Sequence, residues 1–402
     1  MSAPPSATPL VIALGTTQTL SWASSYYLPA ILAVPASRDL GLSSETFLAA
    51  FSLALVLSAF LGPAVGRTVD RAGGRTILCA SNLTLAAGLA MLSQCGSVWT
   101  LFLAWTVLGV GMGMGLYDTA FAALVRIYGS QARAPITGIT LIAGFASTVG
   151  WPLSGWAEAT WGWREACLMW AGIHLLVSLP VNLLMLPKVR AVAPAAPAAT
   201  SAATGSPAAP PADEPHAQRQ PWGLMGLLAF VFAATWFVTG ALATHLPRVL
   251  QEAGATPAQA IGFAALMGPA QVAARVAEFA LLRKVHPVVT TRIAAAMHPL
   301  GGLCLLLFGP AAMALFTILH GGGNGLLTIA KGTLPLALLG PKDYGYRQGL
   351  IGAPGRFVQA LAPLLFGFLV TRYGAGALAF SALLSLSAFA ALWFVSRTPA
   401  RS

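Results

Sequence analysis

Ionisable side chains inside long apolar stretches are the part of this sequence best suited to carry chemistry. Five of them stand away from the expected loops: Asp118, Arg275, Glu278, Lys331 and Arg356. A charged group in apolar surroundings is costly, so such residues usually bind a ligand, carry a proton or pair with each other. Three of the five are cationic, and all three fall in the second half of the chain. This pattern indicates a site for a negatively charged molecule.

Arg356 is the strongest candidate ligand for such a molecule. It lies well inside the apolar stretch 347–370, where no acidic residue can pair with it locally. A guanidinium group holds a carboxylate through two parallel hydrogen bonds, which gives both affinity and orientation. Gln359 follows three residues later on the same helical face and can share the ligand. The alternative role for Arg356 is a structural salt bridge or a contact with a helix end.

A polar stripe runs along the neighbouring apolar stretch 312–338. His320, Asn324, Thr328 and Lys331 recur at spacings of four, four and three, which places them on one face of a helix. Such a face should border water or a cavity rather than lipid. We therefore expect Asn324 and Lys331 to bind substrate; the alternative is hydrogen bonding between helices around the adjacent glycines.

Asp118 and Arg275 each have two interpretations. A buried carboxylate at Asp118 can carry a coupling proton, or it can form an ion pair with Arg126 or with a cation of the other half. Arg275 can contact the substrate, or it can pair with Glu278 three residues later.

An aromatic wall is expected opposite the cations. Gln18, Trp22 and Tyr26 share one face of the first apolar stretch at spacings of four, and Tyr117 immediately precedes Asp118. Aromatic rings with an amide suit the carbon skeleton of a small organic anion.

The elements that position these residues are membrane spans. Hydrophobic residues make up 57% of the 402 positions and charged residues only 8%, and the mean hydropathy is +0.75. Soluble proteins carry about a quarter of their residues as charged ones, so the composition predicts an all-α membrane protein. Spans of about 20 residues account for twelve apolar stretches, at about 9–34, 45–66, 74–94, 98–125, 134–157, 166–186, 222–246, 257–278, 290–310, 312–338, 347–370 and 375–396.

The twelve spans divide into two pseudo-symmetric halves of six. Residues 1–187 are expected to form one bundle and residues 221–402 the other, joined by an Ala- and Pro-rich segment, 188–220, that we expect to be a disordered cytoplasmic linker. Four short matches recur in the same order in both halves: residues 27–29 with 245–247, 62–64 with 268–270, 115–116 with 325–326, and 152–153 with 363–364. Transporters built from repeats place their site near the midplane between the halves.

A charged, glycine-rich segment joins the second and third spans. Gly66, Asp70, Arg71, Gly73 and Arg75 stand in the pattern G-x-x-x-D-R-x-G-x-R, which we expect to form a tight loop. The pattern resembles the signature loop of the major facilitator superfamily. The segment from Arg133 to Gly138 resembles the loop between the fourth and fifth spans of that family.

This resemblance implies the twelve-helix fold of the family and transport by rocking of the two halves. It also implies that Asp70, Arg71 and Arg75, together with Arg133, belong to a gate on the cytoplasmic side. Carriers of oxalate and monocarboxylates in this family grip the anion with cations of spans 8 and 11, to which Arg275 and Arg356 are similar. Trp105 stands where drug antiporters commonly carry an arginine, which disfavours drug efflux.

The basic residues predict the orientation. With both termini inside, fifteen Lys and Arg residues fall in inner loops and tails and four in outer loops, as the positive-inside rule requires. We expect an integral protein of a bacterial inner membrane with cytoplasmic termini. The net charge of +11 is scattered over these loops, so we expect no nucleic-acid partner.

The sequence favours a secondary transporter that moves a small carboxylate or another organic anion by alternating access. The alternative is a proton-coupled exporter of drugs or metabolites, for which Asp118 is the main acidic residue. A membrane enzyme or receptor is disfavoured, because no catalytic cluster, phosphate loop or signalling domain is visible. We expect no cofactor and no metal, and a monomer whose partners are its substrate and membrane lipids.

Overall fold

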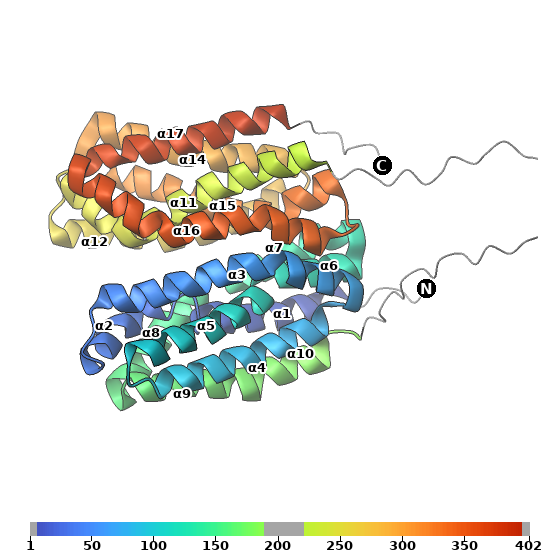
Figure 1. Cartoon of the computed structure of the whole chain (residues 1–402). Helices are drawn as coiled ribbons and strands as arrows, with labels where there is room; N and C mark the ends of the chain where they lie inside the picture. Colours follow the sequence, from blue (N-terminus) through green and yellow to red (C-terminus); the bar gives the residue numbers. More distant parts are fainter. Residues whose placement is uncertain (1–5, 189–220, 396–402) are drawn as a thin grey trace, which may run out of the picture.

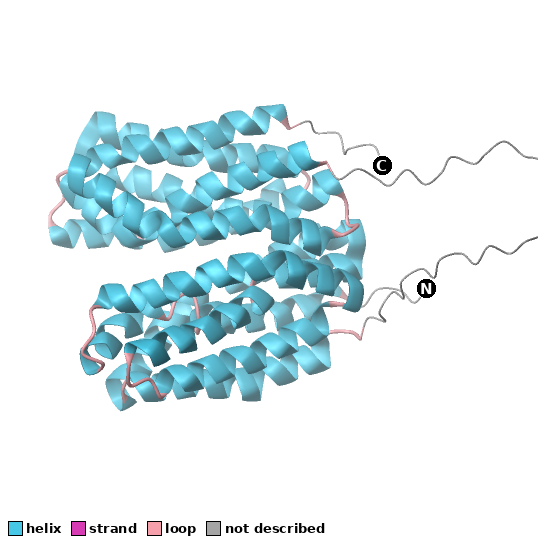
Figure 2. Cartoon of the chain, viewed as in Figure 1, coloured by secondary structure: helices cyan, strands magenta, loops and turns pink. Residues whose placement is uncertain are grey.

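The computed structural model describes residues 6–188 and 221–395, and within these ranges the chain is helical without any strand (Figure 2). Nearly all of the expected linker, 188–220, lies outside the described residues. The helices form two bundles that lie side by side, one from each half of the sequence (Figure 1). The prediction of an all-α membrane protein with two six-span halves is confirmed.

The first bundle holds the helices before the linker. They are α1 (Ala7–Ala23), α2 (Pro29–Asp39), α3 (Ser44–Ala72), α4 (Gly74–Ser93), α5 (Val98–Gly115), α6 (Tyr117–Tyr128), α7 (Arg133–Ala143), α8 (Ala146–Trp161), α9 (Trp163–Ile173) and α10 (Leu179–Met185), with a short 3₁₀ turn, η1 (Gly129–Ala132), and a π turn, η2 (His174–Ser178).

The second bundle holds the remaining helices. They are α11 (Trp222–Glu252), α12 (Pro257–Ala265), α13 (Met267–Ala277), α14 (Pro287–Phe308), α15 (Met313–Leu339), α16 (Tyr344–Tyr373) and α17 (Ala377–Ala391), with the short turns η3 (Glu278–Leu282), η4 (Gly309–Ala312), η5 (Gly374–Gly376) and η6 (Leu392–Phe394).

Several expected spans are built from two helices. Eight continuous helical stretches of the described chain are long and apolar enough to cross a membrane. The longest, Val98–Trp161, has 64 residues, and at 1.5 Å per residue it far exceeds a hydrocarbon core of about 30 Å. It therefore contains the expected spans 98–125 and 134–157.

Breaks within spans have identifiable causes. The first expected span is interrupted between Ala23 and Pro29, and Pro29, which has no backbone N–H to donate, occupies the first position of α2. The fourth is interrupted at Leu116, whose extended backbone follows a glycine-rich run and separates α5 from α6. That break places Tyr117 and Asp118 in the first turn of α6.

The segment expected as a loop at Gly66–Arg75 is almost entirely helical. α3 continues to Ala72, and Gly73 alone separates it from α4. Gly73 has a φ of +85°, a conformation that residues with a Cβ rarely adopt, so one residue reverses the chain. The loop prediction was wrong because charged residues at a span end can be solvated on a helix that continues beyond the apolar region.

Glycines bring the two bundles together along α3 and α16, which pack against each other. Gly62 and Gly66 on α3 face Gly349 and Gly345 on α16, and a Cβ at Gly66 or Gly349 would collide with the opposing backbone. Both helices thus carry small residues four positions apart, the spacing that lets membrane helices approach closely. The bundles meet on the side of the molecule where α1 begins and α17 ends (Figure 1).

Candidate functional site

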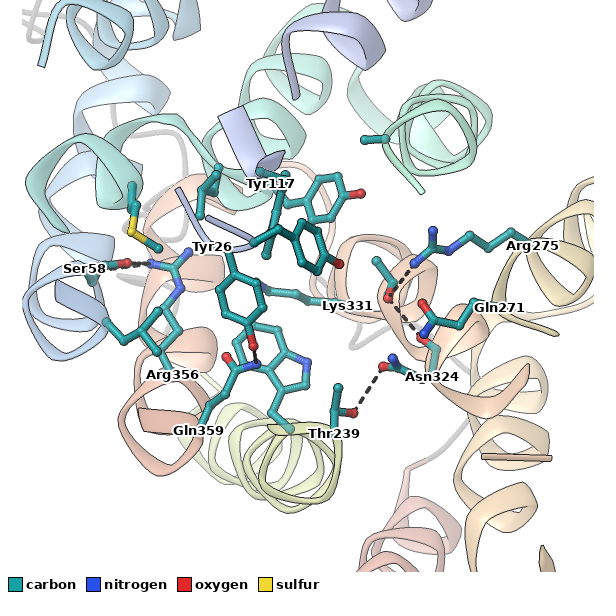
Figure 3. A pocket seen from close by; sticks show the side chains of 18 residues that line it. Tyr26, Ser58, Tyr117, Thr239, Gln271, Arg275, Asn324, Lys331, Arg356 and Gln359 are labelled. Atoms are coloured by element: carbon teal, nitrogen blue, oxygen red, sulfur yellow. Dashed lines mark hydrogen bonds between the residues drawn. The ribbon is translucent and has the colours of Figure 1, made fainter. Parts of the chain in front are cut away.

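A cavity of about 110 Å³ lies between the two bundles. A single water needs roughly 10–15 Å³ on this measure, so the cavity can hold a small solute. Eight of the nine residues expected to bind substrate line it: Trp22, Tyr26, Tyr117, Arg275, Asn324, Lys331, Arg356 and Gln359. Figure 3 shows side chains of both bundles converging on this space. No carboxylate is among the described residues that line it.

Arg356 is anchored by both bundles. Its Nη1 donates to the carbonyl oxygen of Ser58 (3.0 Å) and to Ser58 Oγ (3.1 Å), and its Nη2 forms an ion pair with Asp118. Local pairing within 347–370 is indeed absent among the described residues, but the partner comes from the other half of the molecule. The sequence left open that Arg356 forms a structural salt bridge. The structure shows such a salt bridge at its Nη2.

Asp118 joins two cations of the opposite bundle. Its carboxylate contacts Lys331 Nζ at 2.5 Å as well as Arg356, and Gln348 Nε2 donates to it at 3.4 Å. All three charged side chains are at least nine-tenths buried. Of the two pairings considered for Asp118, the structure shows the one with cations of the other half rather than the one with Arg126.

Lys331 also lies over an aromatic ring. Its Nζ is 3.9 Å from the ring centroid of Trp236 on α11. Such a cation–π contact, when desolvated, contributes roughly 2 kcal/mol. The ammonium is thus fixed between Asp118 and Trp236 at the edge of the cavity.

Arg275 has no carboxylate partner among the described residues. Its Nη1 donates to the carbonyl oxygen of Thr140 at 3.5 Å and its Nη2 to Thr328 Oγ1 at 3.4 Å, both long contacts. Of the two interpretations of Arg275, the pair with Glu278 is not formed: Glu278 accepts from Arg133 Nη2 at 3.1 Å instead. Side chains three apart can pair only if neither is drawn elsewhere, and here Arg275 points into the cavity (Figure 3).

The aromatic wall forms largely as expected. Trp22 packs on Tyr26 and on Tyr117, with ring centroids 5.2 and 4.9 Å apart, and Gln359 Nε2 donates to the Tyr26 hydroxyl at 2.9 Å. Gln18 is the exception. It lies outside the cavity and donates to the carbonyl oxygen of Gly115 at 2.6 Å, a carbonyl left without a helical partner where α5 ends.

Some cavity residues were missed by sequence reasoning. Ser58, Thr239 and Gln271 line the cavity but are ordinary polar residues of apolar spans, with no spacing that distinguishes them. Asn324 was expected, and it accepts a hydrogen bond from Thr239 Oγ1 at 3.1 Å.

The side on which the bundles meet is held by Asp70. Its two carboxylate oxygens accept from the backbone N–H groups of Gly345 and Tyr346 at the start of α16, each at 2.8 Å. Anions favour this position because a helix N-terminus carries partial positive charge. Arg67 lies over the ring of Tyr346 at 4.2 Å.

A second group of polar contacts between the bundles joins α7 to the segment that follows α13. Arg133, at the start of α7, donates to Glu278 and to the carbonyl oxygens of Leu282 and Val285. Of the expected gate residues, Asp70, Gly66 and Arg133 contact the opposite bundle, and Gly73 makes the chain reversal. Arg71 is exposed and Arg75 is half-buried, and in the described part of the chain neither forms a hydrogen bond or an ion pair with the opposite bundle.

Comparison with known proteins gives consistent similarities. The model of the Major Facilitator Superfamily matches residues 14–329. An MFS-type efflux pump of Mycolicibacterium smegmatis is 34% identical over 175 residues, which span 42% of this chain and only 39% of that protein. The transporter YycB of Bacillus subtilis is 25% identical over 358 residues, 85% of this chain and 81% of that protein.

Solved structures share the fold at low identity. The human organic anion transporter MFSD10 (TETRAN) superimposes with a TM-score of 0.73 at 16% identity, covering 97% of this chain and 100% of that one. The transporter FucP, in the outward conformation, gives a TM-score of 0.68 at 14% identity, covering 96% and 98%.

Proposed function

The chain belongs to the major facilitator superfamily, and from that premise we propose that this secondary transporter carries a small organic anion, bound in the cavity by Arg275, Lys331 and Arg356. As a member of this family it is a transporter and not an enzyme. The observation that carries the proposal is the charge of the cavity: three cations line it, and one carboxylate, Asp118, is shared between two of them.

Among the three cations of the cavity, Arg275 is the one without a carboxylate partner among the described residues. It is buried, its hydrogen bonds are long, and its Nε has no partner in the described chain. A buried charge without compensation is costly. A carboxylate in the cavity would supply the missing charge and accept two parallel hydrogen bonds.

The remaining walls suit a small carbon skeleton. Trp22, Tyr26 and Tyr117 provide aromatic surface. The amide of Gln359 lies beside Tyr26, and that of Asn324 lies across the cavity (Figure 3). The volume favours anions of a few carbons, such as small mono- or dicarboxylates. The organic anion transporter that shares the fold is compatible with this class, although the charges of this cavity, and not that likeness, support the proposal.

We also propose an orientation. The expected placement of the termini in the cytoplasm puts the contacts of Asp70 and Arg133 on the cytoplasmic side, so this conformation is closed there.

The test is anion binding by purified protein with and without Arg275. Wild-type protein should be stabilised against heating by oxalate, malonate or succinate, because a ligand stabilises the state that it binds, and the diamides of these acids should have no effect. A charged hydrogen bond contributes about 1.5–3 kcal/mol, so Arg275→Gln should weaken binding by about 10- to 150-fold.

The matched control is Arg248→Gln, because Arg248 is an exposed cation of the same bundle outside the cavity. Equal anion affinity of Arg275→Gln and wild type would exclude the proposed site. Binding that depends on Asp118 and prefers organic cations would favour the alternative exporter of drugs.

A further inference from the structure

A second buried polar site lies beside the substrate cavity, within the C-terminal bundle. His298 on α14 and His320 on α15 approach each other with 3.0 Å between their Nδ1 atoms. His298 Nε2 lies 3.0 Å from Ser381 Oγ on α17. Both imidazoles are more than nine-tenths buried, so their hydrogen-bond partners determine what they can do.

The hydrogen bonds determine which nitrogen carries each proton. Ser381 Oγ donates to the carbonyl oxygen of Leu378 at 3.0 Å, so it accepts from Nε2–H of His298. Nδ1 of His298 is then a lone pair and accepts from Nδ1–H of His320. Nε2 of His320 is left as a buried acceptor, and it has no partner in the described part of the chain.

The same histidines border a small cavity of about 10 Å³, close to the size that one water occupies. The other polar residues of its described lining are Thr235, Thr239, Asn324 and Ser385, so α11, α14 and α17 present neither a carboxylate nor a Lys or Arg to the pair. Among the charged groups nearby, Lys331 on α15 and Arg275 on α13 line the larger cavity instead.

Two residues connect the small cavity to the substrate cavity. Thr239 and Asn324 line both and are hydrogen-bonded to each other at 3.1 Å. Figure 3 shows this contact at the wall of the substrate cavity. The two cavities therefore share a polar wall, and His320 lies on the smaller one.

We propose that the His298–His320 pair is the protonation site that couples transport to a proton gradient. This inference rests on the proposed transport of an anion. A proton from cavity water bonds to Nε2 of His320 and gives an imidazolium whose Nδ1–H still donates to His298. On release the proton returns to water, and no other bond changes.

Coupling follows from charge. A buried imidazolium is costly without a nearby negative charge, and the described residues that line the small cavity include no carboxylate. An anion in the adjacent cavity supplies that charge, so proton and anion are each bound more tightly in the presence of the other. Asp118 suits this role less well, because two cations already hold its charge.

A second buried histidine provides a matched control. His174 in the N-terminal bundle is as buried as His320, but both of its ring nitrogens have partners, Ser24 at 2.7 Å and Asn82 at 3.3 Å. It lies outside both cavities. Its replacement should leave coupling intact.

The experiment measures two activities of the full chain in sealed lipid vesicles with labelled oxalate, malonate, succinate and benzenesulfonate. One is exchange, with the same anion on both sides and no pH gradient. The other is net accumulation driven by a more acidic exterior, with leakage into protein-free vesicles subtracted. A gradient of about one pH unit drives about tenfold accumulation through one-to-one coupling of a monoanion.

His320→Gln and His298→Gln should retain exchange, which also shows that they fold, and should lose accumulation. His174→Gln should retain both. Accumulation by His320→Gln equal to that of wild type would overturn the inference, as would a wild type that exchanges anions but ignores the gradient. If wild type exchanges none of the four anions, the proposed function fails, and the proton site inferred from it fails as well.

Discussion

Replacement of Asp118 tests whether the three buried charges act as one unit. Asp118→Asn leaves Lys331 and Arg356 side by side without a negative charge, although both remain buried. Removing one member of a buried ion pair costs about 3–5 kcal/mol, and here one carboxylate serves two cations. We expect a loss at the upper end of that range.

The informative variant is the double replacement. Lys331→Met alone should destabilise the protein, because it removes a partner of Asp118. In the background of Asp118→Asn, the same change removes one of two uncompensated cations and should restore stability. Neighbouring residues of this kind couple by about 0.5–3 kcal/mol, so the double variant should be more stable than Asp118→Asn.

The assay is thermal unfolding at fixed detergent concentration, followed by tryptophan fluorescence. Asp39→Asn serves as the control, because Asp39 pairs with Arg164 at the exposed end of α2, and surface pairs contribute about 1 kcal/mol or less. A double variant less stable than Asp118→Asn, with the two losses simply adding, would refute the view that these charges compensate each other across the bundles.

Three further outcomes are expected. Gly349→Leu should place a side chain against the backbone of α3, lower stability by roughly 1–3 kcal/mol, and lengthen the distance between spin labels on α3 and α16. Trp236→Leu should remove the ring under Lys331 and cost roughly 0.5–2 kcal/mol in unfolding measurements. Hydrogen bonds from Arg164 and Trp163 lower the pKa of Asp39, so their stabilisation is complete above the usual carboxyl range and is lost as the pH falls through the lowered value. The unfolding temperatures of Arg164→Gln and wild type should therefore converge in acid.

The sequence predicted the fold well because a membrane imposes simple rules. Every span must be helical and about 20 residues long, so apolar stretches such as 222–246 and 312–338 identified α11 and α15 directly. Details within spans were less predictable. Gly73 alone makes the reversal that ten residues seemed to need, and the spacing of Gly62 with Gly66 and of Gly345 with Gly349 indicates close helix packing only once the two helices are known to face each other.

The candidate site was predictable in its members but not in their pairings. The free-energy cost of a charge in an apolar span indicated that Arg275, Lys331 and Arg356 are functional. All three line the cavity. Spacing suggested that Arg275 pairs with Glu278, whereas Glu278 pairs with Arg133 of the other bundle. Gln18 shares a helical face with Trp22 and Tyr26, yet a break in a neighbouring helix diverts it to a backbone carbonyl.

By itself the sequence determined that the protein lies in a membrane, that its fold is all-α, and which charged residues within the spans are candidates for function. These follow from local quantities: hydropathy, helical periodicity and the price of a charge in an apolar medium. Only the tertiary structure decided that Asp118 compensates two cations, that Arg275 is left without a carboxylate among the described residues, and that His320 presents a free nitrogen to a cavity. Each of those facts depends on contacts between residues far apart in the chain, since electrostatic compensation acts through distance in space and leaves no periodic trace in a sequence.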